Sequence, residues 1–176
     1  MNYAALKTHD VANGPGIRVS LFVSGCTHRC PGCFNAEAWD FSYGEEFTDA
    51  VADRLMEALA PSYIKGLSLL GGEPFEPSNR AVLAPLLERM RREYPEKTVW
   101  CYSGYDFERD LLAHRVGDGE TVDRMLENID ILVDGRFVEA LKSARLRFRG
   151  SSNQRIICVR ESLAEGRVVL WEGMNA

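Results

Sequence analysis

The sequence lacks the features that mark membrane, exported and nucleic-acid-binding proteins. No stretch approaches the roughly 20 consecutive apolar residues that a transmembrane helix needs, and residues 1–10 have no apolar core of the kind found in signal peptides. Positive charge is not in excess, because the formal net charge is -5. A broad basic surface for phosphate contacts is therefore not expected. We expect a cytoplasmic protein with a protein or small-molecule partner and no nucleic acid or membrane partner.

Cysteine is scarce and unevenly placed. The chain has five cysteines in 176 residues, and three of them fall between positions 26 and 33. Because the cytosol keeps thiols reduced, crowded intracellular cysteines bind metals or do chemistry more often than they form disulfides. Cys101 and Cys158 lie within apolar strand patterns, which predicts small buried core residues. The candidate metal ligands are Cys26, Cys30 and Cys33.

Short β-branched segments alternate with longer amphipathic segments along the chain. This alternation is typical of parallel strands joined by crossover helices. With neither an internal repeat nor a long linker, residues 1–176 are expected to form one domain. Ser78 is expected to cap a helix. Strands are predicted at 17–23, 67–70, 98–102, 129–133, 155–159 and 168–171, and helices at 47–60, 78–94, 107–114 and 122–127.

The predicted elements are too few for a closed eight-stranded β/α barrel, which typically takes about 250 residues. The length favours a partial barrel or an open sheet, and both bind ligands at the carboxyl ends of parallel strands. The sequence motifs fall at such ends. The cysteines follow the first predicted strand, Gly71-Gly72-Glu73-Pro74 follows the second, Ser103 the third and Asp134 the fourth.

The three cysteines form a Cys-x3-Cys-x2-Cys array directly after the first predicted strand. Thiolates are soft ligands that suit iron-sulfur clusters or zinc. A [4Fe-4S] cubane held by three protein thiolates leaves one iron free to bind a substrate. Zinc stays open as an alternative, because His28 would complete a Cys3His site in an interaction module. A disulfide is disfavoured by the reducing compartment.

The cysteine array and Gly71-Gly72-Glu73-Pro74 together resemble the signature of the radical S-adenosylmethionine superfamily. The resemblance implies an α/β fold, a partial (β/α)6 barrel with parallel strands and outer helices. It implies a [4Fe-4S] cluster on the three cysteines, whose open iron chelates S-adenosyl-L-methionine. The residues implied to contact this cofactor are Gly32, Cys33, Phe34, Gly71, Gly72, Glu73, Ser103 and Asp134.

Each of these cofactor contacts has a structural alternative. Gly71 and Gly72 let a backbone approach a ligand closely, and Glu73 can accept from an ammonium group, but the same residues suit a plain strand-to-helix turn. Ser103 and Asp134 lie where polar groups of ribose or methionine are expected. They equally suit a helix cap and an ordinary turn.

Three further segments narrow the resemblance to the activating proteins of anaerobic ribonucleoside-triphosphate reductases. The resemblance runs from Asp10 to about Ile157, with a cysteine at 158 where that family usually has an acid and an apparent insertion at 117–122. The segments are Asn13-Gly14-Pro15-Gly16-Ile17-Arg18, Leu132-Val133-Asp134-Gly135-Arg136-Phe137 and Arg149-Gly150-Ser151-Ser152-Asn153-Gln154-Arg155.

This resemblance implies a glycyl-radical activating enzyme. Reductive cleavage of S-adenosylmethionine would give a 5'-deoxyadenosyl radical, which abstracts hydrogen from a glycine of the reductase large subunit. The implied electron donor is flavodoxin or ferredoxin. Three alternatives stay open: an activase of another glycyl-radical enzyme such as pyruvate formate-lyase, a small radical enzyme acting on a free metabolite, and the zinc-binding module.

Overall fold

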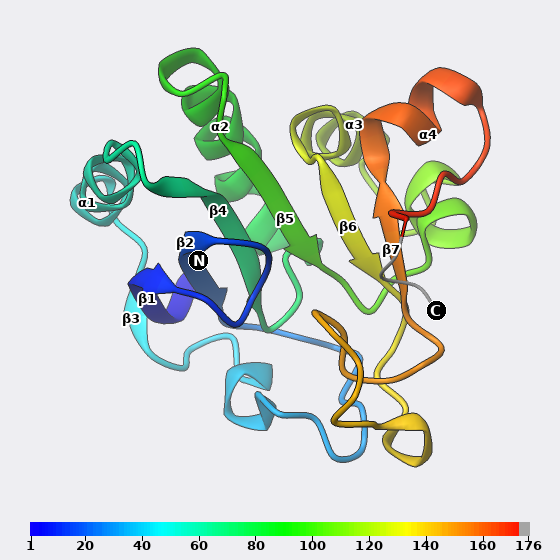
Figure 1. Cartoon of the computed structure of the whole chain (residues 1–176). Coiled ribbons are helices and arrows are strands. Elements are labelled where there is room, and N and C mark those ends of the chain that lie inside the picture. Colours follow the sequence, from blue (N-terminus) through cyan, green and yellow to red (C-terminus); the bar gives the residue numbers. More distant parts are fainter. Residues whose placement is uncertain (173–176) are drawn as a thin grey trace.

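The computed structural model describes residues 1–172, and its central feature is a mixed seven-stranded sheet (Figure 1). The strand order is β3-β1-β2-β4-β5-β6-β7. The strands are β1 (Asn2–Asp10), β2 (Ile17–Val23), β3 (Glu45–Glu46), β4 (Ile64–Gly71), β5 (Thr98–Tyr102), β6 (Ile131–Asp134) and β7 (Arg155–Cys158). The helices are α1 (Asp49–Leu59), α2 (Pro77–Glu93), α3 (Gly119–Asn128) and α4 (Val159–Glu165), with the short 3-10 helices η1 (Ala36–Trp39) and η3 (Glu139–Leu141) and the π-helix η2 (Phe107–Leu112).

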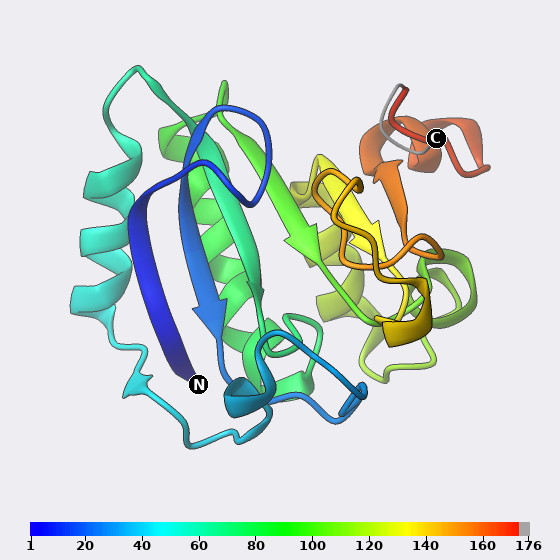
Figure 2. The ribbon, with the colours of Figure 1, turned by 60° about the horizontal axis from the view of Figure 1, so that its bottom comes forward.

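Only the middle of the sheet is parallel. Strands β2, β4, β5 and β6 pair in parallel, whereas β1 and β7 run antiparallel to β2 and β6. Helices α1, α2 and α3 make the crossovers between the parallel strands and cover one face of the sheet (Figure 2). Successive crossovers of the same hand place their helices on the same side. The opposite face is left to the loops. Within residues 1–172, no helix is both long and apolar enough to cross a membrane.

The expected partial (β/α)6 barrel of parallel strands is wrong, because the sheet is open and mixed. Loop 135–154 after β6 contains only the short helix η3 and makes no helical crossover, so β7 returns antiparallel to β6. Segment 168–171 does not extend the sheet as a full strand. It forms an isolated bridge between Ile157 and Leu170. The α/β class itself is confirmed.

The predicted bounds of the strands and helices agree best with the structure where the segments are apolar. Strands β2 and β5 have the predicted bounds. Helix α2 begins at Pro77, which suits the first helical position, and its N-cap residue is Glu76. The prediction that Ser78 caps this helix is wrong, because Ser78 lies inside the first turn and is exposed. Strand β1 was not predicted, since its sequence is largely polar.

The main core lies between the sheet and its helices. Cys101 is fully buried in it, as predicted, whereas Cys158 is half-buried beside a second, smaller cluster on the opposite face. That cluster contains Trp100, Ile131, Val133 and Ile156. The main core packs residues from four parallel strands against the helices, among them Val19, Leu21, Leu55, Leu69, Leu83, Leu87, Val99, Met125 and Leu132.

A buried arginine fastens three neighbouring strands. Arg18 on β2 is 1% exposed, and its guanidinium donates to Ser68 Oγ (2.8 Å) and Thr98 Oγ1 (3.0 Å). It also donates to the carbonyl oxygens of Leu67 and Thr98, both at 2.8 Å. The Ser68 hydroxyl in turn donates to the carbonyl of Asn13 (2.6 Å). Burial lowers the pKa of Arg18 to about 10, so the side chain stays charged at neutral pH.

Replacing Arg18 with methionine should destabilise the fold. Arg18→Met removes the guanidinium donor of the buried Ser68 hydroxyl and of the Leu67 and Thr98 carbonyl groups, which should lower the free energy of unfolding by about 3 kcal/mol. Urea denaturation measures this change. The control is Arg92→Met on the exposed last turn of α2, for which a change within about 0.5 kcal/mol is expected. Equal denaturation midpoints for the two variants would contradict the structural role of Arg18.

Candidate functional site

The loop that carries the cysteines interlocks with the Gly71-Gly72-Glu73-Pro74 turn. Strands β2 and β4 are parallel, with Val23 opposite Gly71, so both loops leave the sheet at the same edge. The Gly72 N–H donates to the Val23 carbonyl (2.7 Å) and the Glu73 N–H to that of Gly25 (2.8 Å). A Cβ would lie 2.6 Å from the Val23 oxygen at position 71 and 2.5 Å from the Gly25 oxygen at position 72. Both glycines are therefore required by close backbone packing.

Glu73 is a buried hub at this edge. The residue is 1% exposed, and its carboxylate accepts four hydrogen bonds. One oxygen, Oε1, accepts from the Phe75 N–H and the Ser103 hydroxyl, both at 2.9 Å. The other, Oε2, accepts from the Gly104 N–H (2.8 Å) and from His28 Nε2 (3.1 Å). One side chain thus joins the ends of β4 and β5 to the cysteine loop.

The residues between the first two cysteines are held by two acidic side chains. Because a carboxylate accepts hydrogen bonds, His28 donates to Glu73 through Nε2. The His28 side chain is 4% exposed, and its ring packs edge-on against Tyr105 at a centroid distance of 4.3 Å. The Thr27 N–H and hydroxyl both donate to Glu76 Oε1, at 2.7 and 2.5 Å. Protein contacts alone therefore shape this part of the loop.

A cavity of about 690 Å³ opens beside the cysteine loop, within the size range of cofactor sites. Its lining residues come from the cysteine loop, the uncovered face of the sheet and loop 135–154. The two loops follow the carboxyl ends of the parallel strands β2 and β6 (Figure 1). Gly32 and Asp134, two predicted cofactor contacts, are not among its lining residues. The predicted site residues that do line it are Cys26, Cys30, Cys33, Phe34, Gly71, Gly72, Glu73 and Ser103.

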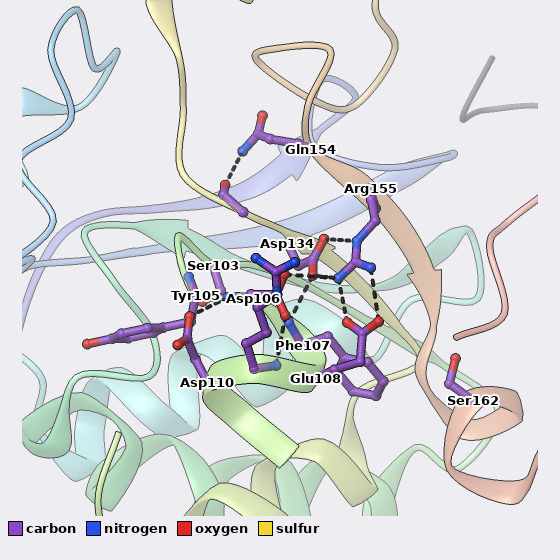
Figure 3. A network of polar contacts seen from close by, with 12 residues as sticks. Ser103, Tyr105, Asp106, Phe107, Glu108, Asp110, Asp134, Gln154, Arg155 and Ser162 are labelled. Atoms are coloured by element: carbon purple, nitrogen blue, oxygen red, sulfur yellow. Dashed lines mark hydrogen bonds and ion pairs between the residues drawn. The ribbon is translucent and has the colours of Figure 1, made fainter. Parts of the chain in front are cut away.

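Asp134 belongs to a separate polar network (Figure 3). Its carboxylate accepts from the Phe107 N–H (2.9 Å) and Arg155 Nε (3.0 Å), and it also pairs with Arg155 Nη2. Arg155 pairs in addition with Glu108 (2.6 Å), and this hydrogen bonding lowers the pKa of Glu108. Asp106, Glu108 and Asp134 lie close enough together for a metal ion, but the guanidinium already supplies their counter-charge. Cofactor contact by Asp134 stays a prediction.

Burial opposes ionisation of two of the cysteine thiols, those of Cys26 and Cys30. Burial, followed by the charge of Glu73, raises the pKa of Cys26 to about 11. Burial also raises the pKa of Cys30. Since only the thiolate binds a metal, a cationic centre has to offset this cost. Backbone N–H groups also donate to the sulfur atoms: that of Asn35 to Cys33 Sγ (3.4 Å), those of His28 and Arg29 to Cys26, and that of Phe137 to Cys30. The donor set therefore fits a metal cluster.

Comparison with known proteins places this site in a family. Residues 12–157 match the family model of a 4Fe-4S single cluster domain. The anaerobic ribonucleoside-triphosphate reductase-activating protein of Escherichia coli (strain K12) is 42% identical over 156 residues, which cover 88% of this chain and 96% of that protein. The chain belongs to the activating-protein family. The protein of that name from Haemophilus influenzae is 40% identical over 88% of this chain and 96% of that protein. The one from Enterobacteria phage T4 is 39% identical over 89% of this chain and 93% of that protein.

The match to the 4Fe-4S domain covers nearly the whole cavity. Its range includes every lining residue except Lys7 on β1. The side chains that build the remaining walls of the cavity were not predicted from the amino-acid sequence. Tyr102 and Phe22 come from the sheet, and Phe137 and Phe148 come from loop 135–154. Their apolar character is visible in the sequence, but no periodicity indicates that loop 135–154 folds beside the sheet face.

Adding a methyl group at position 104 should disturb the hub. A Cβ there would lie 2.5 Å from His28 Cδ2, so Gly104→Ala has to displace the ring and break its bond to Glu73. We expect the free energy of unfolding to fall by about 1–3 kcal/mol in urea denaturation. In a His28→Ala background the clash is absent, and the same change should cost less than half as much. Equal costs in the two backgrounds would refute this coupling.

Proposed function

We propose that this chain activates an anaerobic ribonucleoside-triphosphate reductase by forming a glycyl radical on its large subunit. The observation that carries the proposal is the placement of Cys26, Cys30 and Cys33 on one wall of a cavity of about 690 Å³ that Glu73 and Ser103 also line. The names of the relatives and the 4Fe-4S domain support the same reading. We propose that residues 1–176 act as one domain and that flavodoxin or ferredoxin is the electron donor.

The three cysteines would hold a [4Fe-4S] cluster with one iron left for S-adenosylmethionine. When bound, the reduced cluster supplies one electron that breaks the sulfonium carbon-sulfur bond, giving methionine and a 5'-deoxyadenosyl radical that takes a hydrogen atom from the glycine. The chain's own residues hold the thiolates, orient the cofactor and exclude water. This assignment needs no side-chain acid or base.

Two observations favour a cluster over a single zinc ion. In a tetrahedral zinc site with Zn–S bonds of about 2.3 Å, sulfur atoms lie about 3.8 Å apart. Among the described residues, no three ligand atoms of Cys26, His28, Cys30 and Cys33 gather within 4.8 Å of one another. His28 Nε2 is also engaged with Glu73. Three thiolates without a fourth protein ligand suit a cubane that keeps one iron open.

The cavity walls indicate how the cofactor would be held. Gly71, Gly72 and Ser103 line the cavity next to the cysteines. Glu73 already accepts four hydrogen bonds, so an ammonium group of the ligand would replace or share one of them. Phe34 lines the cavity and is 64% exposed. We propose that these residues contact the cofactor.

Two predicted contacts lie outside the cavity lining. Gly32 faces Glu139, because a Cβ at position 32 would lie 2.6 Å from its carboxyl carbon. The Asp134 carboxylate is occupied by Arg155 and the Phe107 N–H. Contact of these two residues with the cofactor stays a prediction, and we propose in addition that Gly32 turns the cysteine loop and that Asp134 fixes the end of β6.

Each of the three cysteines should be necessary for the cluster. Replacing Cys26, Cys30 or Cys33 with alanine removes one of three ligands, so anaerobically reconstituted variants should lose most of their iron and their brown colour. The wild-type chain should bind about four irons and four sulfides. Cys158→Ala is the matched control and should bind as much iron as the wild type. A colourless wild-type protein that contains zinc would refute the cluster.

The activity itself has a direct test. The reconstituted chain is incubated with a candidate reductase, S-adenosylmethionine and dithionite, and electron spin resonance records the products. A glycyl radical on the reductase and one 5'-deoxyadenosine released per radical are expected. A radical on a pyruvate formate-lyase but not on the reductase would assign the chain to the alternative partner.

A further inference from the structure

Positive charge is concentrated in one part of the loop between β6 and β7. Residues 136–149, termed the basic loop, have a net charge of +4, whereas the rest of the chain has a net charge of -9. The formal net charge of the whole chain, -5, does not reveal this uneven distribution. The charged residues of the basic loop are Arg136, Glu139, Lys142, Arg145, Arg147 and Arg149.

The basic loop combines these charges with exposed apolar side chains. Lys142, Arg145 and Arg147 are exposed, and Leu141, the last residue of η3, is 43% exposed beside them. The Lys142 ammonium lies 4.5 Å from the ring centre of Phe34 on the cysteine loop. Arginine and aromatic side chains in one patch are characteristic of protein interfaces. The patch therefore suits a protein partner.

The basic loop is held in place by the segment that follows it. The Gln154 side chain accepts from the N–H groups of Gly150 (2.8 Å) and Ser151 (3.1 Å) and donates to the Gly135 carbonyl (2.9 Å), a contact drawn in Figure 3. The Ser152 N–H donates to the Leu141 carbonyl (3.0 Å). Because the backbone is already ordered, a partner that binds here pays little to immobilise it.

The two sides of the basic loop face different surroundings. Lys142, Phe148 and Arg149 line the cavity beside the cysteines, whereas Arg145 and Arg147 do not and are exposed. A partner seated on the outer side would therefore lie next to the cavity mouth. The net positive charge selects a partner surface of the opposite sign.

We infer that the basic loop and Phe34 form a docking surface for an acidic, partly apolar surface of the protein whose glycine is oxidised. This inference rests on the proposed function. Docking there brings the target glycine to the cavity and sets the rate of encounter through long-range charge. Arg145 and Arg147 lie outside the cavity lining, so binding of the cofactor and the cluster does not depend on these two side chains.

The test reverses charge at the two arginines outside the cavity. With dithionite as reductant, R145E/R147E should cleave S-adenosylmethionine at the wild-type rate when the reductase is absent. Its kcat/KM for glycyl radical formation should fall by about 10-fold or more at low salt, chiefly through KM. Raising the ionic strength should raise the wild-type KM and narrow the difference. R145K/R147K should behave as wild type.

The matched control, R92E/R115E, makes the same change in net charge at exposed positions on α2 and after η2. An equal loss in this control would overturn the inference, as would wild-type kinetics in R145E/R147E. A loss seen only with flavodoxin and not with dithionite would also overturn it, because the surface would then serve the electron donor. A wild-type chain that cleaves the cofactor but forms no radical on the reductase instead refutes the proposed function.

Discussion

The buried carboxylate of Glu73 is the interaction on which the site depends. A carboxylate this far from water is stable only when donors surround it, and here the four donors come from three different segments. Satisfying that one group therefore fixes the end of β4, the end of β5 and the middle of the cysteine loop together. The cavity wall and the ligand loop are positioned by the same requirement.

The sheet supports this arrangement by bringing the segments to one edge. Parallel pairing of β2 with β4 and of β4 with β5 puts three carboxyl ends side by side. Arg18 holds the same three strands from their uncovered face. Farther along the sheet, Arg155 joins β7 to the end of β6 through Asp134. In both places an arginine guanidinium donates hydrogen bonds to polar groups of neighbouring strands, in addition to the backbone hydrogen bonds that pair those strands.

Much of the site was predictable because it follows from local patterns. The apolar runs of β2, β4 and β5 reveal parallel strands, and parallel strands bring Cys26, Glu73 and Ser103 to one edge. The secondary structure of these segments could be predicted without knowing which distant residues they contact. Their motifs also carried the resemblance to the activating-protein family, which the comparisons support.

The rest could not be predicted because it depends on pairings between distant residues. The direction of β7 is set by a loop of 20 residues without clear periodicity, and that direction decides against a barrel. The partner of Asp134 lies 21 positions away, and that of His28 lies 45 positions away. From the sequence alone, His28 was a candidate for a fourth zinc ligand, whereas in the structure its ring donates a hydrogen bond to Glu73.

The hydrogen bonds from Thr27 and His28 to two acidic side chains also bear on the entropic cost of binding a ligand in the cysteine loop. The donors and acceptors of these bonds all belong to the polypeptide, so this part of the loop has its shape before any ligand is bound. A loop that is ordered in advance loses less conformational freedom when its thiolates close around a bound centre, and this favours binding.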